Sequence, residues 1–171
     1  MAAGWLTRPV RSIELVLTPD ADRAVRAAWD ALTLADLPSL GRSGTNDPHV
    51  TVVAGDDVAV PDAIATPPAL LRLGGVLLFP AGPGRSVLAR AVVVGPALAA
   101  FHAAVHRATR ETVDTSAPGA WSPHVTFARR VRDVDLGAAV AALRSAPLPN
   151  ALGVAGVRHW DGETKTVTRL T

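Results

Sequence analysis

One tetrapeptide, Pro-His-Val-Thr, occurs twice in the chain and carries its most informative chemistry. The copies are residues 48–51 and 123–126, so that His124 follows His49 by 75 positions. Imidazole has an unperturbed pKa near 6.5, and both its neutral and its protonated forms are therefore populated near neutral pH. Two such rings that face each other can act as general base and general acid on one substrate without a metal ion. The sequence leaves open which histidine is the base and which the acid.

Each histidine is followed two positions later by a threonine, Thr51 or Thr126. Both copies lie in stretches that predict β-strands, and side chains alternate between the two faces of a strand. The histidine and threonine of each copy therefore share one face, while the valine between them points to the other. On that shared face a hydroxyl can donate a hydrogen bond to a non-bridging phosphate oxygen as negative charge develops.

Arg130 closely follows the second copy and is a third candidate for holding a phosphate. If the strand continues without interruption, Arg130 has the same parity as His124 and Thr126 and shares their face. A guanidinium there can bind a phosphate through two parallel hydrogen bonds. The alternative is that Arg130 lies at a solvated strand end. We name Thr51, Thr126 and Arg130 as candidate phosphate ligands.

The elements that must position these residues follow one another in a repeated order. Alternation predicts a strand over residues 11–17, and Thr18 followed by Pro19 predicts a capped helix start. Residues 56–68 are compatible with a short helix interrupted by proline. We expect one α+β domain over residues 1–171, with mainly antiparallel pairing and two halves that loosely mirror each other. The other predicted elements are strands at 48–54, 70–79, 86–94 and 123–131, helices at 96–112 and 135–145, and a C-terminal hairpin at 151–170.

Composition excludes several kinds of site. Apolar residues make up 49% of the 171 positions, which is enough for a hydrophobic core. The absence of cysteine excludes disulfides, thiolate metal sites and cysteine nucleophiles. A net charge of +2 is too small for tracking along a nucleic acid, but it suits one anionic group held by a few guanidiniums. Residues 1–11 lack a secretory pattern and no apolar run reaches the roughly 20 residues of a membrane span, so we expect a cytoplasmic protein.

Two other features admit both a functional and a structural interpretation. His102 and His106 lie four positions apart on a predicted helix, which is a metal-ligand spacing, but no glutamate occupies the zinc-protease position. We expect both to edge the apolar stripe of that helix. Trp121 and Trp160 could stack on a base, although core packing is the commoner use of tryptophan. We predict no metal and no cofactor.

The paired motifs, His-Val-Thr-Val at 49–52 and His-Val-Thr-Phe at 124–127, resemble the double His-x-Thr/Ser-x signature of the two-histidine (2H) phosphoesterase superfamily. Bacterial members of that superfamily are often called 2′-5′ RNA ligase-like proteins, and the resemblance spans nearly the whole chain. It implies a two-lobed α+β fold with a pseudo-twofold axis, in which two mainly antiparallel sheets line a central cleft and helices lie outside. It also implies metal-independent chemistry on 2′,3′-cyclic phosphates or 2′-5′ linkages, with His49 and His124 as the acid-base pair.

On this interpretation the partner is an RNA end or a small nucleotide, and we expect a monomer. One departure concerns base recognition, since relatives often place aromatic residues near the cleft whereas this chain has no tyrosine, four tryptophans and three phenylalanines. Two alternatives stay open. The first is a module that binds a nucleotide or RNA end in the same cleft without turnover, and the second is a metalloenzyme that recruits His102 or His106. Turnover in a chelator argues against the second, and tight binding without turnover argues for the first.

Overall fold

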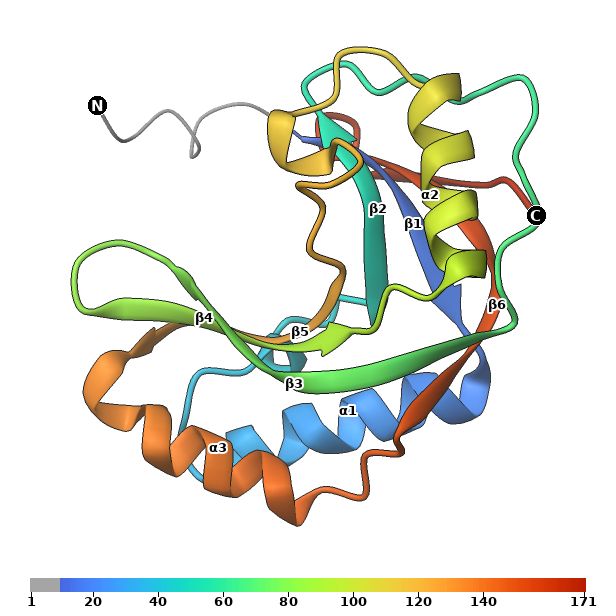
Figure 1. Ribbon diagram of the computed structural model, residues 1–171. Helices are drawn as coiled ribbons and strands as arrows, with labels where there is room; N and C mark the ends of the chain where they lie inside the picture. The colour runs from blue at the N-terminus through green and yellow to red at the C-terminus, as the bar shows by residue number, and fades with distance from the viewer. Residues whose placement is uncertain (1–9) are drawn as a thin grey trace.

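Residues 10–171, which the computed structural model describes, pair seven strands into one antiparallel sheet with the order β2-β1-β6-β3-β4-β5, and β7 pairs with β6 (Figure 1). The part of the N-terminal prediction that concerns residues 1–9 lies outside the described residues. The strands are β1 (Arg11–Leu17), β2 (His49–Gly55), β3 (Leu70–Pro80), β4 (Arg85–Val92), β5 (His124–Arg132), β6 (Ala151–Asp161) and β7 (Thr166–Arg169).

The sheet is divided into two wings that meet at a short contact. One wing contains β2, β1, β6 and β7, and the other contains β3, β4 and β5. Among residues 10–171, the strand pairing that joins them links Leu70–Arg72 of β3 to Ala151–Gly153 of β6. Strands β2 and β5, at opposite ends of the strand order, nevertheless contact each other across the space between the wings (Figure 1). The two expected antiparallel sheets are thus present, linked into one bent sheet.

Three helices cover this sheet: α1 (Pro19–Leu34), α2 (Pro96–Ala108) and α3 (Leu136–Ser145). Helices α1 and α3 pack against each other beneath the β3-β4-β5 wing, and α2 packs beside β2 (Figure 1). The start of α1 is as predicted, with Thr18 in extended geometry and Pro19 in the first turn, although the Thr18 side chain makes no capping hydrogen bond. Within residues 10–171, no helix combines the length and the apolar character that crossing a membrane requires.

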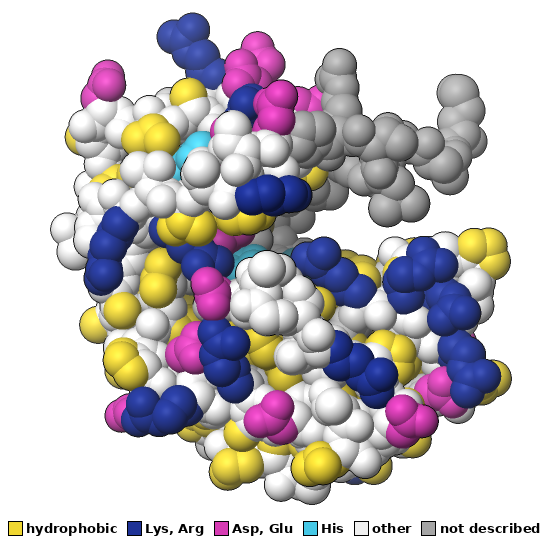
Figure 2. Space-filling model, turned by 180° about the vertical axis from the view of Figure 1, so that it is seen from behind, with side chains coloured by type: hydrophobic (Ala, Val, Ile, Leu, Met, Phe, Trp, Pro, Cys, Tyr) yellow, Lys and Arg dark blue, Asp and Glu magenta, His cyan; other side chains and the backbone are white. Residues whose placement is uncertain are grey.

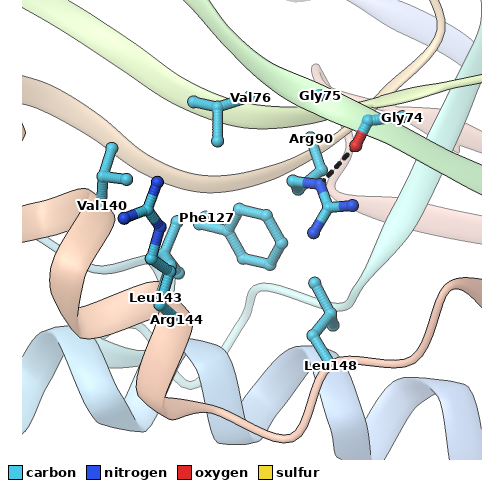
Figure 3. A pocket seen from close by; sticks show the side chains of 9 residues that line it. All are labelled: Gly74, Gly75, Val76, Arg90, Phe127, Val140, Leu143, Arg144 and Leu148. Carbon is cyan, nitrogen blue, oxygen red and sulfur yellow. Dashed lines mark hydrogen bonds between the residues drawn. The ribbon is translucent and has the colours of Figure 1, made fainter.

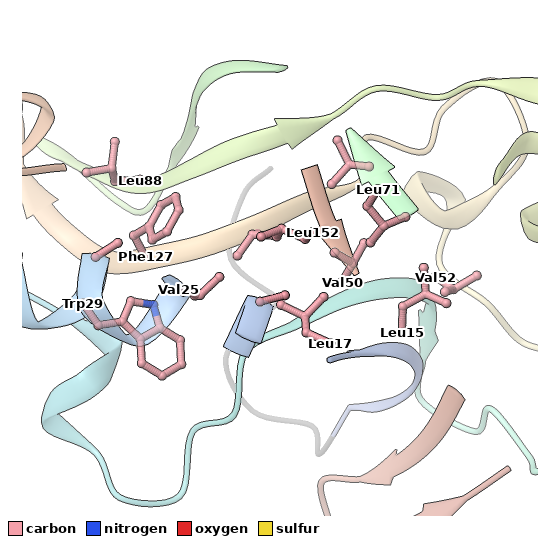
Figure 4. Close-up of a cluster of buried hydrophobic side chains, with 14 of the residues drawn as sticks. Leu15, Leu17, Val25, Trp29, Val50, Val52, Leu71, Leu88, Phe127 and Leu152 are labelled. Atoms are coloured by element: carbon pink, nitrogen blue, oxygen red, sulfur yellow. The ribbon is translucent and has the colours of Figure 1, made fainter. Parts of the chain in front are cut away.

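One continuous core lies on the sheet face opposite to the motif histidines. Val50 and Val52 of β2 and Val125 and Phe127 of β5 are at most 1% exposed. They pack with side chains from α1 and the central strands, among them Trp29 (Figure 4). The alternation predicted for both motif strands is therefore confirmed.

Two segments differ from the prediction made from sequence. No helix forms in residues 56–68, where the prolines interrupt any helical turn. The helix expected over residues 96–112 ends at Ala108 because Thr109 is extended and its hydroxyl donates to the carbonyl oxygens of Val105 and His106. Short 3-10 turns occupy Leu40–Arg42, Asp114–Ser116 and Asp133–Asp135.

Candidate functional site

The two motif histidines meet in a narrow cleft between the wings. Seen from behind, the surface is hollowed between its upper and lower parts, with histidine visible in the hollow and basic side chains around it (Figure 2). Helix α1, the loop before β2, and strands β2 and β5 all contribute to the cleft. Its lining residues are Trp29, Leu40, Asp47, His49, Thr51, His124, Thr126 and Arg129.

Both imidazoles are anchored in the same way. Nδ1 of His49 lies 2.7 Å from the carbonyl oxygen of Asp47, and Nδ1 of His124 lies 2.7 Å from that of Ser122. A carbonyl oxygen can only accept, so Nδ1 carries the hydrogen in both rings. In each motif the carbonyl belongs to the residue two positions before the histidine, with a proline between them. Nε2 is consequently the nitrogen left for chemistry in both histidines.

The surroundings of His124 favour its neutral form. Burial lowers the pKa of His124 below its ordinary value of 6.5, and electrostatic interaction with His49 and Arg129 lowers the pKa further, while the hydrogen bond to Ser122 opposes these effects. The ring of Phe79, from the β3-β4 hairpin, packs against His124 with centroids 4.6 Å apart. His124 thus presents a restrained, neutral imidazole to the cleft at pH 7.

His49 instead lies beside the carboxylate of Glu14, a residue outside both motifs. Nε2 of His49 is 3.5 Å from Oε1 of Glu14, whose side chain is only 5% exposed. Glu14 accepts hydrogen bonds from Ser12 Oγ at 2.7 Å and from Arg158 Nε at 2.8 Å. The signal available in the sequence was an acidic residue in the middle of the first predicted strand, between Ile13 and Leu15.

Arginine side chains balance the second carboxylate near His49. Asp47 lines the cleft and forms ion pairs with Arg26 at 2.8 Å and with Arg158 at 3.3 Å. Arg158 also pairs with Glu14, so one guanidinium bridges both acids. The two guanidiniums offset part of the negative charge of Glu14 and Asp47, while Arg26 also pairs with Asp22 at 2.6 Å.

The position predicted for Arg130 is wrong, and Arg129 takes the place on the cleft wall. Thr126 of β5 pairs with Ala89 of β4, and Ala128 pairs with Leu88. Phe127, between them, has no partner of its own and forms a β-bulge. The bulge reverses the parity beyond it, so that Arg129 rather than Arg130 lines the cleft with His124. Arg130 itself has a φ of 58° at a second irregularity of the strand.

The motif threonines are placed as predicted, beside the rings. Thr51 and Thr126 both line the cleft and are half-buried. In the described part of the chain, neither hydroxyl takes part in a hydrogen bond, so both are available to a bound group. Together the two threonines, the two Nε2 atoms and the Arg129 guanidinium surround a space suited to an anionic, tetrahedral group.

The histidines and tryptophans for which the sequence allowed both a functional and a structural interpretation have partners within the fold. His102 is 3% exposed, its Nε2 lies 2.9 Å from the Ser116 carbonyl oxygen, and its ring stacks on Trp121 at 3.9 Å. Nε2 of His106 lies 3.3 Å from the Thr112 hydroxyl. Across residues 10–171, no cluster of three or more histidine, aspartate or glutamate side chains is arranged to bind a metal ion. Trp160 lies beneath the Lys165 ammonium at 5.8 Å and is not among the residues that line the cleft.

A second cavity, of about 220 Å³, lies on the other face of the β3-β4-β5 wing, against α3 (Figure 3). Phe127, which follows Thr126 in sequence but points to the opposite face, lies at its centre. Arg90 and Arg144 flank the cavity, and Arg90 Nε donates to the Gly74 carbonyl oxygen at 2.7 Å. The strands separate this cavity from the histidines, so the two sites are distinct.

Comparison with known proteins identifies the family and the fold of the chain. The family model of the 2′-5′ RNA ligase superfamily matches residues 19–165. Among solved structures, Usb1 of Kluyveromyces marxianus is 12% identical, with 95% of this chain and 98% of that chain covered and a TM-score of 0.51. Its structure with uridine monophosphate is also 12% identical, covering 94% and 97%, with a TM-score of 0.48. No curated protein sequence matches. The structural likeness shows a shared fold, and because the family match spans both motifs and the elements that carry them, the chain belongs to the 2′-5′ RNA ligase superfamily, the two-histidine phosphoesterases.

Proposed function

We propose that this protein is a metal-independent phosphoesterase in which His49 and His124 act on 2′,3′-cyclic phosphate or 2′-5′ phosphodiester bonds of RNA or nucleotides. The observation that carries the proposal is the matched anchoring of the two rings. Each Nδ1 is held by a backbone carbonyl 2.7 Å away, and each Nε2 is left for proton transfer. The proposal includes a cytoplasmic, monomeric protein that takes RNA ends or small nucleotides as substrates.

We assign the base to His124 and the acid to His49. The lowered pKa of His124 leaves its Nε2 lone pair free at pH 7, so it can take a proton from the attacking water. His49 has the Glu14 carboxylate 3.5 Å from Nε2, and a proton on that nitrogen therefore faces a negative charge. In hydrolysis of a cyclic phosphate, the water oxygen bonds to phosphorus, the bond from phosphorus to O2′ or O3′ breaks, and His49 protonates the departing oxygen. In ligation the 5′-hydroxyl of a second RNA end takes the place of water, the bond from phosphorus to O3′ breaks and a 2′-5′ linkage forms. Cleavage of that linkage by the neighbouring 3′-hydroxyl is the reverse step, in which the two histidines exchange roles.

The remaining cleft residues would stabilise charge on the phosphate. Thr51 and Thr126 would each donate a hydrogen bond to a non-bridging oxygen, one from each wing. Arg129 would supply the guanidinium that we first expected from Arg130. Their hydrogen bonds to the phosphate would become stronger as negative charge accumulates on it during the reaction. These residues would therefore contribute to turnover as well as to binding.

Hydrolysis of a 2′,3′-cyclic mononucleotide in excess EDTA tests the proposal. The unaltered protein is compared with His49→Ala and His124→Ala, and circular dichroism verifies that both variants are folded. We expect turnover that survives the chelator and is lost in both variants. Turnover that the chelator abolishes would refute the metal-independent mechanism, and equal turnover in all three proteins would refute the histidine pair. Tight nucleotide binding without turnover would favour the binding module.

A further inference from the structure

The backbone carbonyl of each motif threonine accepts a hydrogen bond from a tryptophan. Trp121 Nε1 donates to the Thr51 carbonyl oxygen at 3.0 Å, and Trp29 Nε1 donates to that of Thr126 at 3.1 Å. Each indole comes from the half of the chain opposite to the motif strand that it contacts. Trp29 belongs to α1 in the first half of the chain and holds β5 of the second half, whereas Trp121 precedes β5 and holds β2.

These carbonyls need an outside donor because of where the motif strands lie. Strands β2 and β5 are the two edges of the main strand order, so each has a ladder partner on one side only. Each also has a bulge directly after its threonine. Val52 is the extra residue of β2 between the pairs Glu14↔Thr51 and Ile13↔Val53, as Phe127 is in β5. A bulge loosens the ladder, and an indole N–H restrains the strand at that point.

Both tryptophans are themselves held rigidly. Trp29 is 2% exposed within the core, with its own carbonyl oxygen accepting from Ser39 Oγ at 2.7 Å (Figure 4). Trp121 stacks on buried His102 with ring planes inclined by only 2°. His102 is fixed in turn by the Ser116 carbonyl, and Ser116 Oγ accepts from the backbone N–H of Ala54 in β2. Each indole thus ties a motif strand to a packed element of the other half.

We propose that Trp29 and Trp121 are positioning residues that form a reciprocal brace and set the separation of the two His-Thr pairs across the cleft. The inference rests on the proposed function. The brace acts through the backbone of Thr51 and Thr126, two residues from each histidine, and the indoles form no hydrogen bond with the histidine rings or the threonine hydroxyls. A displacement of about 1 Å between reacting groups can cost on the order of 100-fold in rate, so a modest loosening is measurable.

The test replaces each tryptophan by phenylalanine, with Trp160→Phe as the matched control because Trp160 is not among the residues that line the cleft. For 2′,3′-cyclic mononucleotide hydrolysis in EDTA, we expect kcat to fall about 10- to 100-fold in Trp29→Phe and Trp121→Phe. KM should change by about twofold or less, since a misplaced acid-base pair impairs the transition state more than binding. Trp160→Phe should match the unaltered protein. Unchanged kcat in either folded cleft variant would overturn the brace.

A second readout does not depend on activity. Trp29→Phe should shift and broaden the imidazole NMR signals of His124, and Trp121→Phe those of His49, each leaving the other histidine largely unaffected. Equal responses of both histidines, or none, would overturn the reciprocal arrangement. If the unaltered protein shows no turnover, the proposed function fails, while the NMR comparison still decides on the brace. If a phenylalanine variant does not fold, β-(3-benzothienyl)alanine at that position removes only the N–H and allows the same measurements.

Discussion

Strands β2 and β5 present the same residues with the same ring anchoring, but they place the two histidines in opposite electrostatic surroundings. His49 has the buried Glu14 carboxylate 3.5 Å from Nε2. His124 has the ring of Phe79 and the positive charge of Arg129 instead. The motif therefore fixes what the two halves share, namely geometry, and the neighbouring strands fix what differs, namely charge. A base and an acid can arise from one repeated motif in this way.

The largest expected effect comes from removing either ring. We expect His49→Ala and His124→Ala each to lower kcat by on the order of 10²–10⁴-fold, the usual contribution of a general acid or base. The two variants should differ in their pH dependence. Residual kcat/KM of His49→Ala should still fall on acidification, because protonation of His124 removes the base. This acidic limb should vanish in His124→Ala, and an acidic limb that vanishes in His49→Ala instead would reverse the assignment.

Arg129→Ala should come next in size. A hydrogen bond to a charged group contributes about 1.5–3 kcal/mol, which corresponds to roughly 10- to 150-fold in kcat/KM. Since the Arg129 charge lowers the pKa of His124, its removal should raise that pKa and move the acidic limb of the pH-rate profile to higher pH. Arg130→Ala is the matched comparison one residue away. A larger loss of kcat/KM in Arg130→Ala than in Arg129→Ala would support the first prediction, that Arg130 shares the strand face of His124 and Thr126.

Glu14→Gln is expected to lower kcat by about tenfold, because a protonated His49 loses the carboxylate facing its Nε2. The substitution keeps the shape of the side chain, but it leaves Arg158, 12% exposed, with Asp47 as its remaining acid. Thermal unfolding must therefore be measured in parallel. A drop in melting temperature with unchanged kcat would assign Glu14 to stability alone and break the electrostatic contrast between the strands.

The smallest expected effect is on stability, and it concerns the surroundings of the two tryptophans that form the brace. Burial lowers the pKa of His102, beneath Trp121, from 6.5, so its neutral form contributes stability that is present above pH 6.5 and is lost as the pH falls below it. The ring of Trp29 instead lies beneath the Arg26 guanidinium, 5.6 Å from the ring centroid. We expect the melting temperature of the unaltered protein to fall more steeply between pH 7.5 and 5.5 than that of His102→Gln, whose amide can still donate to Ser116. Identical slopes in differential scanning calorimetry would contradict this prediction.

The sequence by itself predicted the two motifs, the strands that carry them and the shared face of each histidine and threonine, because these depend on local periodicity and on proline geometry. Only the tertiary structure placed Glu14 beside His49, since their contact joins β1 to β2 across the sheet. It also decided between Arg129 and Arg130. The side-chain alternation that predicted Arg130 holds only while each residue pairs with one residue of the neighbouring strand. The bulge at Phe127 arises from the pairing of β5 with β4, and the periodicity of a single strand does not encode that pairing.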